Sequence, residues 1–263
     1  MTDERRQRTR LQEYSLTYPP EIIIYDTSYE VDQFATSSVI DQVGNKQNSV
    51  LTLPTGITPM AMYDLLCQAF DRGDIDFSRV TASNLDEYWP IRREHPASYH
   101  RYMMERLITR VNFQSGNWHI PDGEAPDSHV EAERYDNLLN QLPPSDLAIL
   151  GIGPVLTCHI AFNEQGSEID SRVRYVELDK ETKRANAPHF PDPSEIPQGA
   201  ITQGIANILR AKSILLIAKG EGKAQGIQRT IMGPIGPEAP ASFLRLHPHV
   251  IFVLDKAAAQ LLK

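Results

Sequence analysis

A histidine and a glutamate stand five residues apart in the segment His159–Glu164, which reads HIAFNE. An apolar run at residues 147–153 precedes it and reads LAILGIG, so a strand is expected to deliver both side chains to one loop. An imidazole titrates near neutral pH and a carboxylate can orient it, which suits the pair to acid–base chemistry on a small molecule. The same two residues could instead form a purely structural hydrogen bond, so other segments are needed to decide between a catalytic and a structural role.

An anion site is predicted in residues 49–59, which read SVLTLPTGITP. The pattern predicts a buried strand, a short polar turn and a helix with Thr58 as N-cap and Pro59 at its first position. The first amides of a helix lack partners and its dipole is positive there, so this turn favours a negatively charged ligand.

Two adjacent acids end a third segment, residues 80–88, which reads VTASNLDEY. The apolar start predicts a strand that delivers Asp86 and Glu87 to the same region. Either acid alone would usually be a turn residue or a solvated charge.

Together the three segments resemble the family of glucosamine-6-phosphate deaminases and isomerases, whose sister branch is the 6-phosphogluconolactonases. Members carry a Thr-Gly-Gly-Thr-Pro phosphate loop, an Asp-Glu-Tyr strand end and a Gly-His-Ile-Ala/Gly-Phe-Asn-Glu segment in this order. The resemblance extends from about residue 20 to the C-terminus. It includes three shorter matches: EHPASY at 94–99, RAN at 184–186 and LHP at 246–248.

The resemblance implies a role for each matched residue. Asp86 matches the base that moves a proton from C2 to C1 of the open-chain sugar. His159 matches the residue that assists opening of the pyranose ring, and Glu164 matches its carboxylate partner. In deaminating members the ketose imine is then hydrolysed and ammonia leaves. The residues matched to phosphate binding are Thr55, Gly56, Ile57, Thr58 and Lys223.

The segment before His159 departs from the family pattern. Thr157 stands where the family has an acid or an amide, and Cys158 stands where glycine is usual. The connection at residues 154–158 is also longer than in typical relatives. We therefore expect the imidazole to be oriented mainly by Glu164, and ring opening to be weakened. We interpret Cys158 as a small loop residue rather than a nucleophile, since a thiolate would need cationic help.

The phosphate site departs from the pattern at two positions. Ile57 replaces a second glycine, and a positive φ there would cost a β-branched residue about 1–2 kcal/mol. Pro188 replaces an arginine. A charge-assisted hydrogen bond contributes about 1.5–3 kcal/mol, so phosphate affinity should fall roughly tenfold to a hundredfold unless His189, Lys183 or Arg184 compensates. We therefore interpret the chain as a divergent member of the family, with a different substrate as an open alternative. Arg174 matches one effector-site position of the family, but Val176 occupies another that is basic in regulated relatives, so we expect no amino-sugar effector.

Strands and helices alternate along the chain, which predicts an α/β fold: an open, mainly parallel sheet with helices on both faces. In such sheets ligands bind beyond the carboxyl ends of the strands, where all three segments are expected to meet. The expected strands are 21–25, 49–53, 79–84, 146–152, 172–178, 213–218 and 249–254. The expected helices are 59–72, 97–110, 128–141, 203–210 and 221–232, with one more after a capping box at Thr27.

A single α/β domain is expected over residues 21–263, after a charged N-terminal extension at 1–20. Residues 179–198 combine a short helix with four prolines in ten residues, and proline both lacks a donor and restricts its neighbour. This segment cannot join the sheet. The family resemblance implies a mobile lid there, which would cover the sugar.

Composition excludes several classes of protein. A formal net charge of −8 argues against a nucleic-acid surface, and no apolar stretch is long enough for a bilayer. With 2 cysteines, Cys67 and Cys158, no disulfide framework is visible and the cytoplasm is expected. Gly151 and Gly153 lack the third glycine of a dinucleotide loop, so no NAD or other cofactor is expected. His247 and His249 lack nearby carboxylates, so no metal is expected.

Three functional classes remain open. The first is an aldose–ketose isomerase/deaminase acting on a phosphorylated amino sugar such as glucosamine 6-phosphate. The second is a 6-phosphogluconolactonase, although Phe162-Asn163-Glu164 matches the deaminase branch better. The third is a non-catalytic sugar-phosphate-binding protein that keeps the fold. A homo-oligomer is compatible with each.

Overall fold

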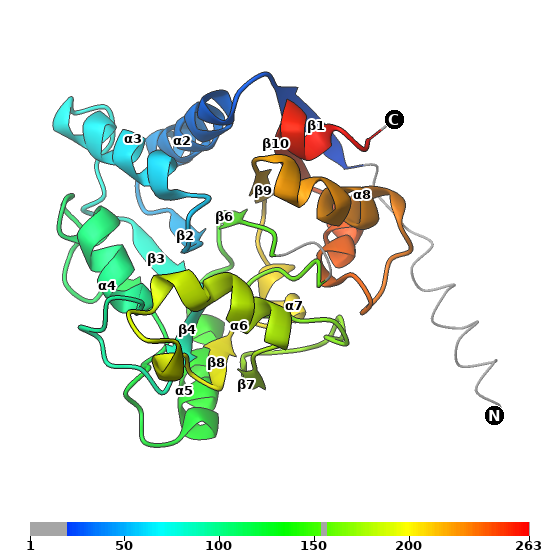
Figure 1. Ribbon diagram of the computed structural model, residues 1–263. Coiled ribbons are helices and arrows are strands. Elements are labelled where there is room, and N and C mark those ends of the chain that lie inside the picture. The colour runs from blue at the N-terminus through cyan, green and yellow to red at the C-terminus, as the bar shows by residue number, and fades with distance from the viewer. Residues whose placement is uncertain (1–19, 154–156, 263) are drawn as a thin grey trace.

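The computed structural model describes residues 20–153 and 157–262, which form one large parallel sheet, a small antiparallel sheet and the helices around them (Figure 1). The expected extension at 1–20 lies outside this range except for Pro20, as does most of the connection before Cys158. Within the described residues the large sheet has seven strands in the order β1-β10-β9-β6-β2-β3-β5. Their bounds are Glu21–Tyr25, Val250–Asp255, Ile214–Ala218, Leu147–Leu150, Val50–Leu53, Thr81–Asn84 and Trp118–His119.

Apolar side chains on successive residues of the inner strands enter two different cores. Leu147 and Ile149 of β6 pack into a core with α2 and α3, whereas Ala148 and Leu150 face a core with α7 and α8. A strand buried on both faces reads as a continuous apolar run, and β6 and β9 have this composition. The predicted α/β class, with helices on both faces of a mainly parallel sheet, is confirmed. The bounds of these helices are Ser28–Asn45 for α2, Met60–Asp71 for α3, Ile205–Ile208 for α7 and Ala224–Met232 for α8.

Local signals set the starts of the helices. The predicted capping box at Thr27 is present. The Thr27 side chain accepts from the Glu30 amide, and the Glu30 carboxylate accepts from the Thr27 amide. The predicted N-cap at Thr58 is wrong: α3 begins at Met60 with Pro59 at the cap and no side-chain cap bond. The remaining long helices are α4 with its π-helical continuation, Tyr99–Met103 and Met104–Ile108, and α5, Ser128–Gln141.

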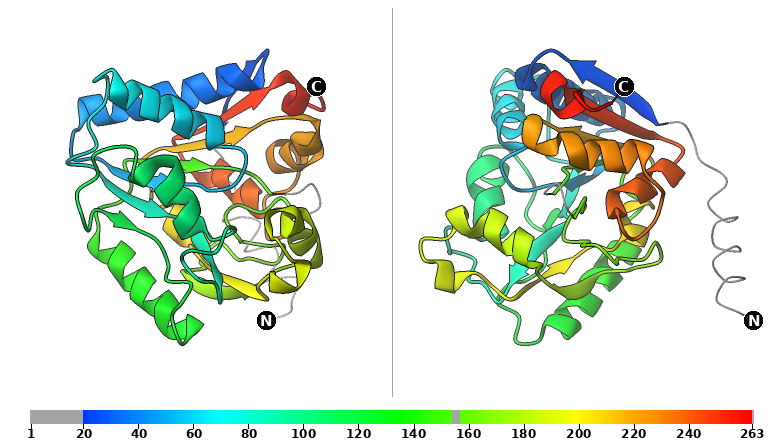
Figure 2. Two further views of the ribbon diagram at one scale, coloured as in Figure 1. Left: turned by 60° about the vertical axis from the view of Figure 1, so that its left-hand side comes forward. Right: turned by 45° about the vertical axis from the view of Figure 1, so that its right-hand side comes forward.

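A second sheet, which the sequence pattern did not predict, contains β4 (Asp86–Trp89), β8 (Gly199–Thr202) and β7 (Arg174–Glu177). Its strands are antiparallel, and Asp86 lies opposite Thr202. The strand predicted at 172–178 therefore belongs to this sheet rather than to the parallel one. Asp86 begins β4 rather than ending a strand, because β3 stops at Asn84 and a single residue separates the two. Both views of Figure 2 place this sheet and α5 away from α2 and α3.

The chain order creates a switch point in the large sheet. From β2 the chain proceeds outward through β3 to β5, and then returns to β6 on the other side of β2. Helical connections on the two sides of such a point leave a crevice at the carboxyl ends of the strands, where α/β proteins bind ligands. The exits of β2, β3 and β6 carry the three segments that we singled out in the sequence.

Residues 179–198 form an excursion between two strands of the small sheet. Glu177 of β7 pairs with Gly199 of β8, and the Leu178 amide donates to the Gln198 carbonyl at 2.9 Å, so the excursion has a closed neck. It contains α6 (Lys180–Asn186), which lies above β8 in Figure 1, and two 3₁₀ turns. Among the described residues, no helix has the length and apolar character needed to cross a membrane.

Candidate active site

The predicted phosphate loop connects β2 to α3. Gly56 alone in this turn has a positive φ, at 88°, so the strain that we considered for Ile57 does not arise. Tyrosine hydroxyls hold the loop from behind: Tyr63 donates to the Pro54 carbonyl at 2.5 Å and Tyr102 donates to the Gly56 carbonyl at 2.7 Å. The Ile57 side chain is 67% exposed and points away from the core.

The two adjacent acids have different surroundings. Asp86 is 5% exposed, and burial together with the neighbouring Glu87 charge raises its pKa well above the ordinary value. Glu87 accepts hydrogen bonds from the amides of Tyr88, Tyr99 and His100 and from the Ser98 hydroxyl. Burial raises the pKa of Glu87 to about 7 while these four donors oppose the shift. Glu87 therefore fixes the start of α4, and Asp86 is the acid suited to proton transfer.

Replacing Glu87 by glutamine should destabilise the protein by about 2–4 kcal/mol. The NH2 group of glutamine is itself a donor, so it would face other donors and form no hydrogen bond with them. The measurement is urea-induced unfolding. Ser98→Ala, which removes one of the four donors and also the N-cap of α4, serves as the milder comparison, with an expected loss of about 1–2 kcal/mol. An unchanged midpoint for Glu87→Gln would show that these contacts do not hold the segment.

The His159 imidazole and the Glu164 carboxylate are in contact, with Nδ1 and Oε2 3.0 Å apart. We expected Glu164 to be the main group that orients the ring, and two hydroxyls lie beside it. The Thr157 hydroxyl lies 2.9 Å from Nδ1, and the Thr182 hydroxyl lies 3.5 Å from it while donating to Glu164 Oε1 at 2.6 Å. A tautomer with its proton on Nδ1 can donate to Glu164, which leaves the Nε2 lone pair free to accept a proton.

Left-handed backbone is found twice in the loop that carries His159. Cys158 has φ 45° and Ala161 has φ 52°, a region that costs a residue with a Cβ roughly 1–2 kcal/mol. Strain of this kind persists where the surrounding contacts require it, often at functional sites. The Cys158 thiol is fully buried and burial raises its pKa, so it is poorly suited to act as a nucleophile.

Lys223 lies at the start of α8, and its ammonium contacts the end of β6. Its Nζ donates to the carbonyl of Ile152 at 2.6 Å and lies 3.3 Å from that of Gly153. Burial lowers the pKa of Lys223. An ammonium has three donors, so one remains for an anion beside the phosphate loop, since β6 and β2 are neighbours.

One aromatic cluster connects the three segments. Tyr88 lies two residues after Asp86 on the same face of β4, and its ring centroid is 5.3 Å from that of Phe162. Tyr99 stacks on Phe162 at 6.0 Å and its side chain hydrogen-bonds Thr55. The Phe162 amide also donates to Thr202, the register partner of Asp86. The side chains of Tyr88, Tyr99 and Phe162 thus link the phosphate loop, the strand of Asp86 and the His159 loop.

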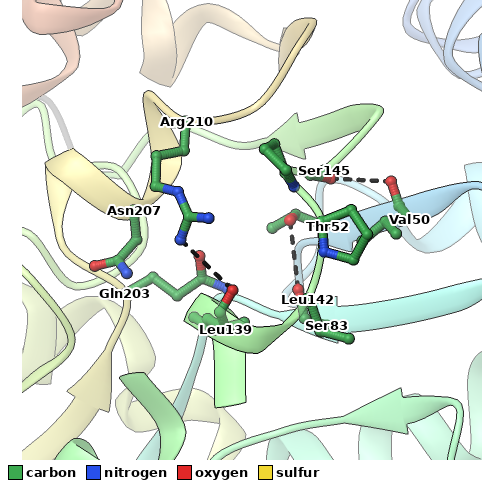
Figure 3. A pocket seen from close by; sticks show the side chains of 11 residues that line it. Val50, Thr52, Ser83, Leu139, Leu142, Ser145, Gln203, Asn207 and Arg210 are labelled. Atoms are coloured by element: carbon green, nitrogen blue, oxygen red, sulfur yellow. Dashed lines mark hydrogen bonds between the residues drawn. The ribbon is translucent and has the colours of Figure 1, made fainter. Parts of the chain in front are cut away.

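Two cavities lined by described residues lie elsewhere. One encloses about 30 Å³ behind β2 and β3, where the hydroxyls of Thr52 and Ser83 face each other near Arg210 (Figure 3). It is too small for a sugar phosphate, because ligand pockets are typically about 300–1,000 Å³. The other, about 510 Å³, lies at the amino ends of β1, β9 and β10, opposite the ends where such sheets bind ligands.

Sequence reasoning missed Thr182 and Tyr99 as parts of this site. Tyr99 belongs to the EHPASY match, which could have indicated it, whereas nothing in the pattern distinguishes Thr182. Among residues 20–153 and 157–262, no cluster of three metal-binding side chains is found. His247 is instead engaged by backbone, with Nε2 2.7 Å from the Ala211 carbonyl and Nδ1 accepting from the His249 amide.

A parallel sheet with a switch point, an anion-binding loop and buried acid–base groups at one edge is the architecture of a small-molecule α/β enzyme. The chain belongs to the glucosamine-6-phosphate isomerase/6-phosphogluconolactonase family, whose model matches residues 27–252.

Known relatives cover nearly all of the chain. The glucosamine-6-phosphate deaminase of Rhodopirellula baltica is 45% identical over 224 residues, 85% of this chain and 88% of that protein. The solved structure of a monomeric glucosamine-6-phosphate deaminase has a TM-score of 0.89 at 36% identity, covering 92% and 99% of the two chains. A 6-phosphogluconolactonase from Trypanosoma cruzi has a TM-score of 0.73 at 19% identity, covering 95% and 99%, and shares the fold.

Proposed function

We propose that the protein is a glucosamine-6-phosphate deaminase, which isomerises the amino sugar and releases ammonia and a ketose phosphate. The observation that carries the proposal is the His159–Glu164 pair at 3.0 Å, on a loop whose Phe162 amide reaches the register partner of Asp86. A relative that is 45% identical and bears this name supports the same substrate.

In this proposal His159 acts first, on the closed ring. Its Nε2 takes the proton of the anomeric hydroxyl and returns a proton to the ring oxygen, which opens the pyranose. Glu164 accepts from Nδ1–H and stabilises the positive charge that develops on the imidazole. The pair needs no cofactor for this exchange, because the proton leaves one oxygen and arrives at another.

Asp86 then carries the isomerisation. It removes the proton from C2 and returns it at C1, while the C1 oxygen gains a proton and the amino nitrogen loses one. The product is the ketose imine, which water hydrolyses. A raised pKa makes Asp86 a stronger base than an exposed aspartate, so the transfer from carbon is less unfavourable. Glu87 contributes to the raised value by its charge.

The sugar phosphate is assigned to the turn after β2. The amides at the start of α3, the hydroxyls of Thr55 and Thr58, and the Lys223 ammonium supply the donors, with Gly56 and Ile57 forming the backbone of the turn. Two substitutes considered for the missing arginine have other partners, since Lys183 binds Gln198 and Arg184 binds Glu181. With only His189 left as a substitute, we expect phosphate to be held more weakly than in relatives that keep that arginine.

Residues 21–263 are proposed to act as one domain, with the excursion at 179–198 as its lid. Asp86 is 5% exposed and His159 is 8% exposed, so the excursion must move for a sugar to enter. The cytoplasm remains the expected location, in keeping with Cys67 and Cys158 forming no disulfide among the described residues.

Three substrates distinguish the candidate functions. Glucosamine 6-phosphate should yield ammonia and ketose phosphate in equal amounts, whereas 6-phosphogluconolactone should be hydrolysed no faster than in buffer. Acid release from the lactone without ammonia would favour the lactonase branch. Binding of glucosamine 6-phosphate by calorimetry with no product would instead leave a sugar-phosphate-binding protein.

A further inference from the structure

The Thr182 hydroxyl connects the excursion to the His159–Glu164 pair. Thr182 lies in α6 and is fully buried. Its Oγ1 donates to Glu164 Oε1 at 2.6 Å, and Oε2 of the same carboxylate faces His159 Nδ1 at 3.0 Å. The two oxygens of one carboxylate thus join the excursion to the imidazole.

We propose that Thr182 is a positioning residue that makes the His159–Glu164 pair competent for ring opening only while α6 is docked. Closure over the sugar and orientation of the imidazole are then one event. The inference rests on the proposed function, because it assigns a task to the same pair.

The physical basis is the freedom of a glutamate side chain. Glu164 has several rotatable bonds, and one contact with His159 leaves its second oxygen without a fixed direction. A short hydrogen bond from a hydroxyl to a carboxylate is among the stronger neutral-to-charged contacts, so Thr182 fixes that direction. When α6 moves away to admit a substrate, this bond breaks and Glu164 is released.

Two other contacts dock the excursion without touching Glu164. Phe190 is 5% exposed, and its ring lies edge-on to Tyr88 with centroids 5.4 Å apart. Glu195 lies 3.3 Å from His95 Nε2. Phe190 therefore holds the far end of the excursion, and the part of its effect on ring opening that comes from docking should pass through Thr182.

The experiment compares Thr182→Val, which keeps the shape and removes the hydroxyl, with Thr182→Ser, which keeps the hydroxyl. We expect Thr182→Val to lower kcat about tenfold to a hundredfold, the value of a hydrogen bond to a charged group, with KM within about threefold. Thr182→Ser should stay within about threefold of wild type in both constants. The matched control is Thr36→Val, which removes a buried helical hydroxyl that donates to the Asp32 carbonyl at 2.7 Å and should leave kcat unchanged.

A second readout needs no turnover. The His159 Nδ1–H resonance, followed by NMR in the free protein, should move in Thr182→Val and stay in place in Thr182→Ser. If wild type releases no ammonia while this resonance behaves as expected, the proposed function fails and the Thr182–Glu164–His159 connection stands. A resonance and a kcat that are both unchanged in Thr182→Val would overturn the inference.

A double-mutant cycle tests the route from Phe190. Phe190→Ala should lower kcat by itself, and its effect should be smaller in the Thr182→Val background, because the loss of docking in both variants acts through Glu164. Effects on kcat that multiply fully would overturn the claim that docking acts through Thr182.

Discussion

Ammonia release from glucosamine 6-phosphate should fall about 10²- to 10⁴-fold in the Asp86→Asn variant, the range in which a general base contributes to an enzymatic rate. The amide keeps the shape of the side chain and cannot accept the C2 proton. The KM should change little, because the proposed phosphate donors lie on the loop after β2 and at Lys223. The rate is measured by coupled detection of ammonia.

The stability of the Asp86→Asn variant should not fall with its activity. Burial raises the pKa of Asp86, which means that the folded protein disfavours the charged form. A neutral amide removes that penalty, so the free energy of unfolding should not decrease. A loss of turnover at undiminished stability would separate a chemical role from a structural one.

Asp146→Asn is the matched control, since this aspartate is also buried, at 4% exposed. Its carboxylate pairs with Lys46 and Lys212 before β6, at the opposite edge of the sheet. The control should lower stability and preserve kcat. Turnover of Asp86→Asn within about threefold of wild type would exclude Asp86 as the base, because a base is worth at least about a hundredfold.

The sequence could predict the parallel sheet because its inner strands are buried on both faces. Apolar runs such as Leu147–Leu150 and Ile214–Ala218 have few other solutions in a chain of this length, and their order with helices implies crossovers. The small sheet could not be predicted in the same way. Residues 86–89 and 199–202 are far apart in sequence, and only tertiary pairing makes them neighbours.

The candidate site shows the same division. His159 and Glu164 are close in sequence, so a single loop sufficed to predict their pairing. Thr182 reaches Glu164 from another element, and a buried helical threonine has no pattern of its own. The catalytic roles of these residues stay predictions, to be tested by the variants described here.

Gly153 illustrates how a tertiary contact gives meaning to a residue that the sequence left ambiguous. In the sequence, Gly151 and Gly153 match part of a dinucleotide-binding loop but lack its third glycine. In the structure, a Cβ added at Gly153 would lie 2.1 Å from His159 Nε2, whereas one added at Gly151 would have no atom within 4 Å. Position 153 therefore requires a glycine, because the imidazole packs directly against the backbone there.

Gly153→Ala should accordingly reduce kcat about a hundredfold, since a displacement of about 1 Å in a catalytic group can cost that much. The ring cannot yield freely, because it is 8% exposed and its Nδ1 is held by Glu164 and Thr157. Overpacking should also lower the free energy of unfolding by about 1–3 kcal/mol. Steady-state kinetics, urea unfolding and the His159 ring resonances are the three measurements.

Gly151→Ala provides the control within the same turn. Its added methyl meets open space and φ at this position is not positive, so stability should change by less than about 0.5 kcal/mol and the His159 resonances should not move. If both alanine variants lost activity equally, with the imidazole undisturbed in each, the loss would come from the turn and not from His159. If Gly153→Ala alone displaces the imidazole and loses turnover, the position of that ring, rather than its mere presence, sets the rate.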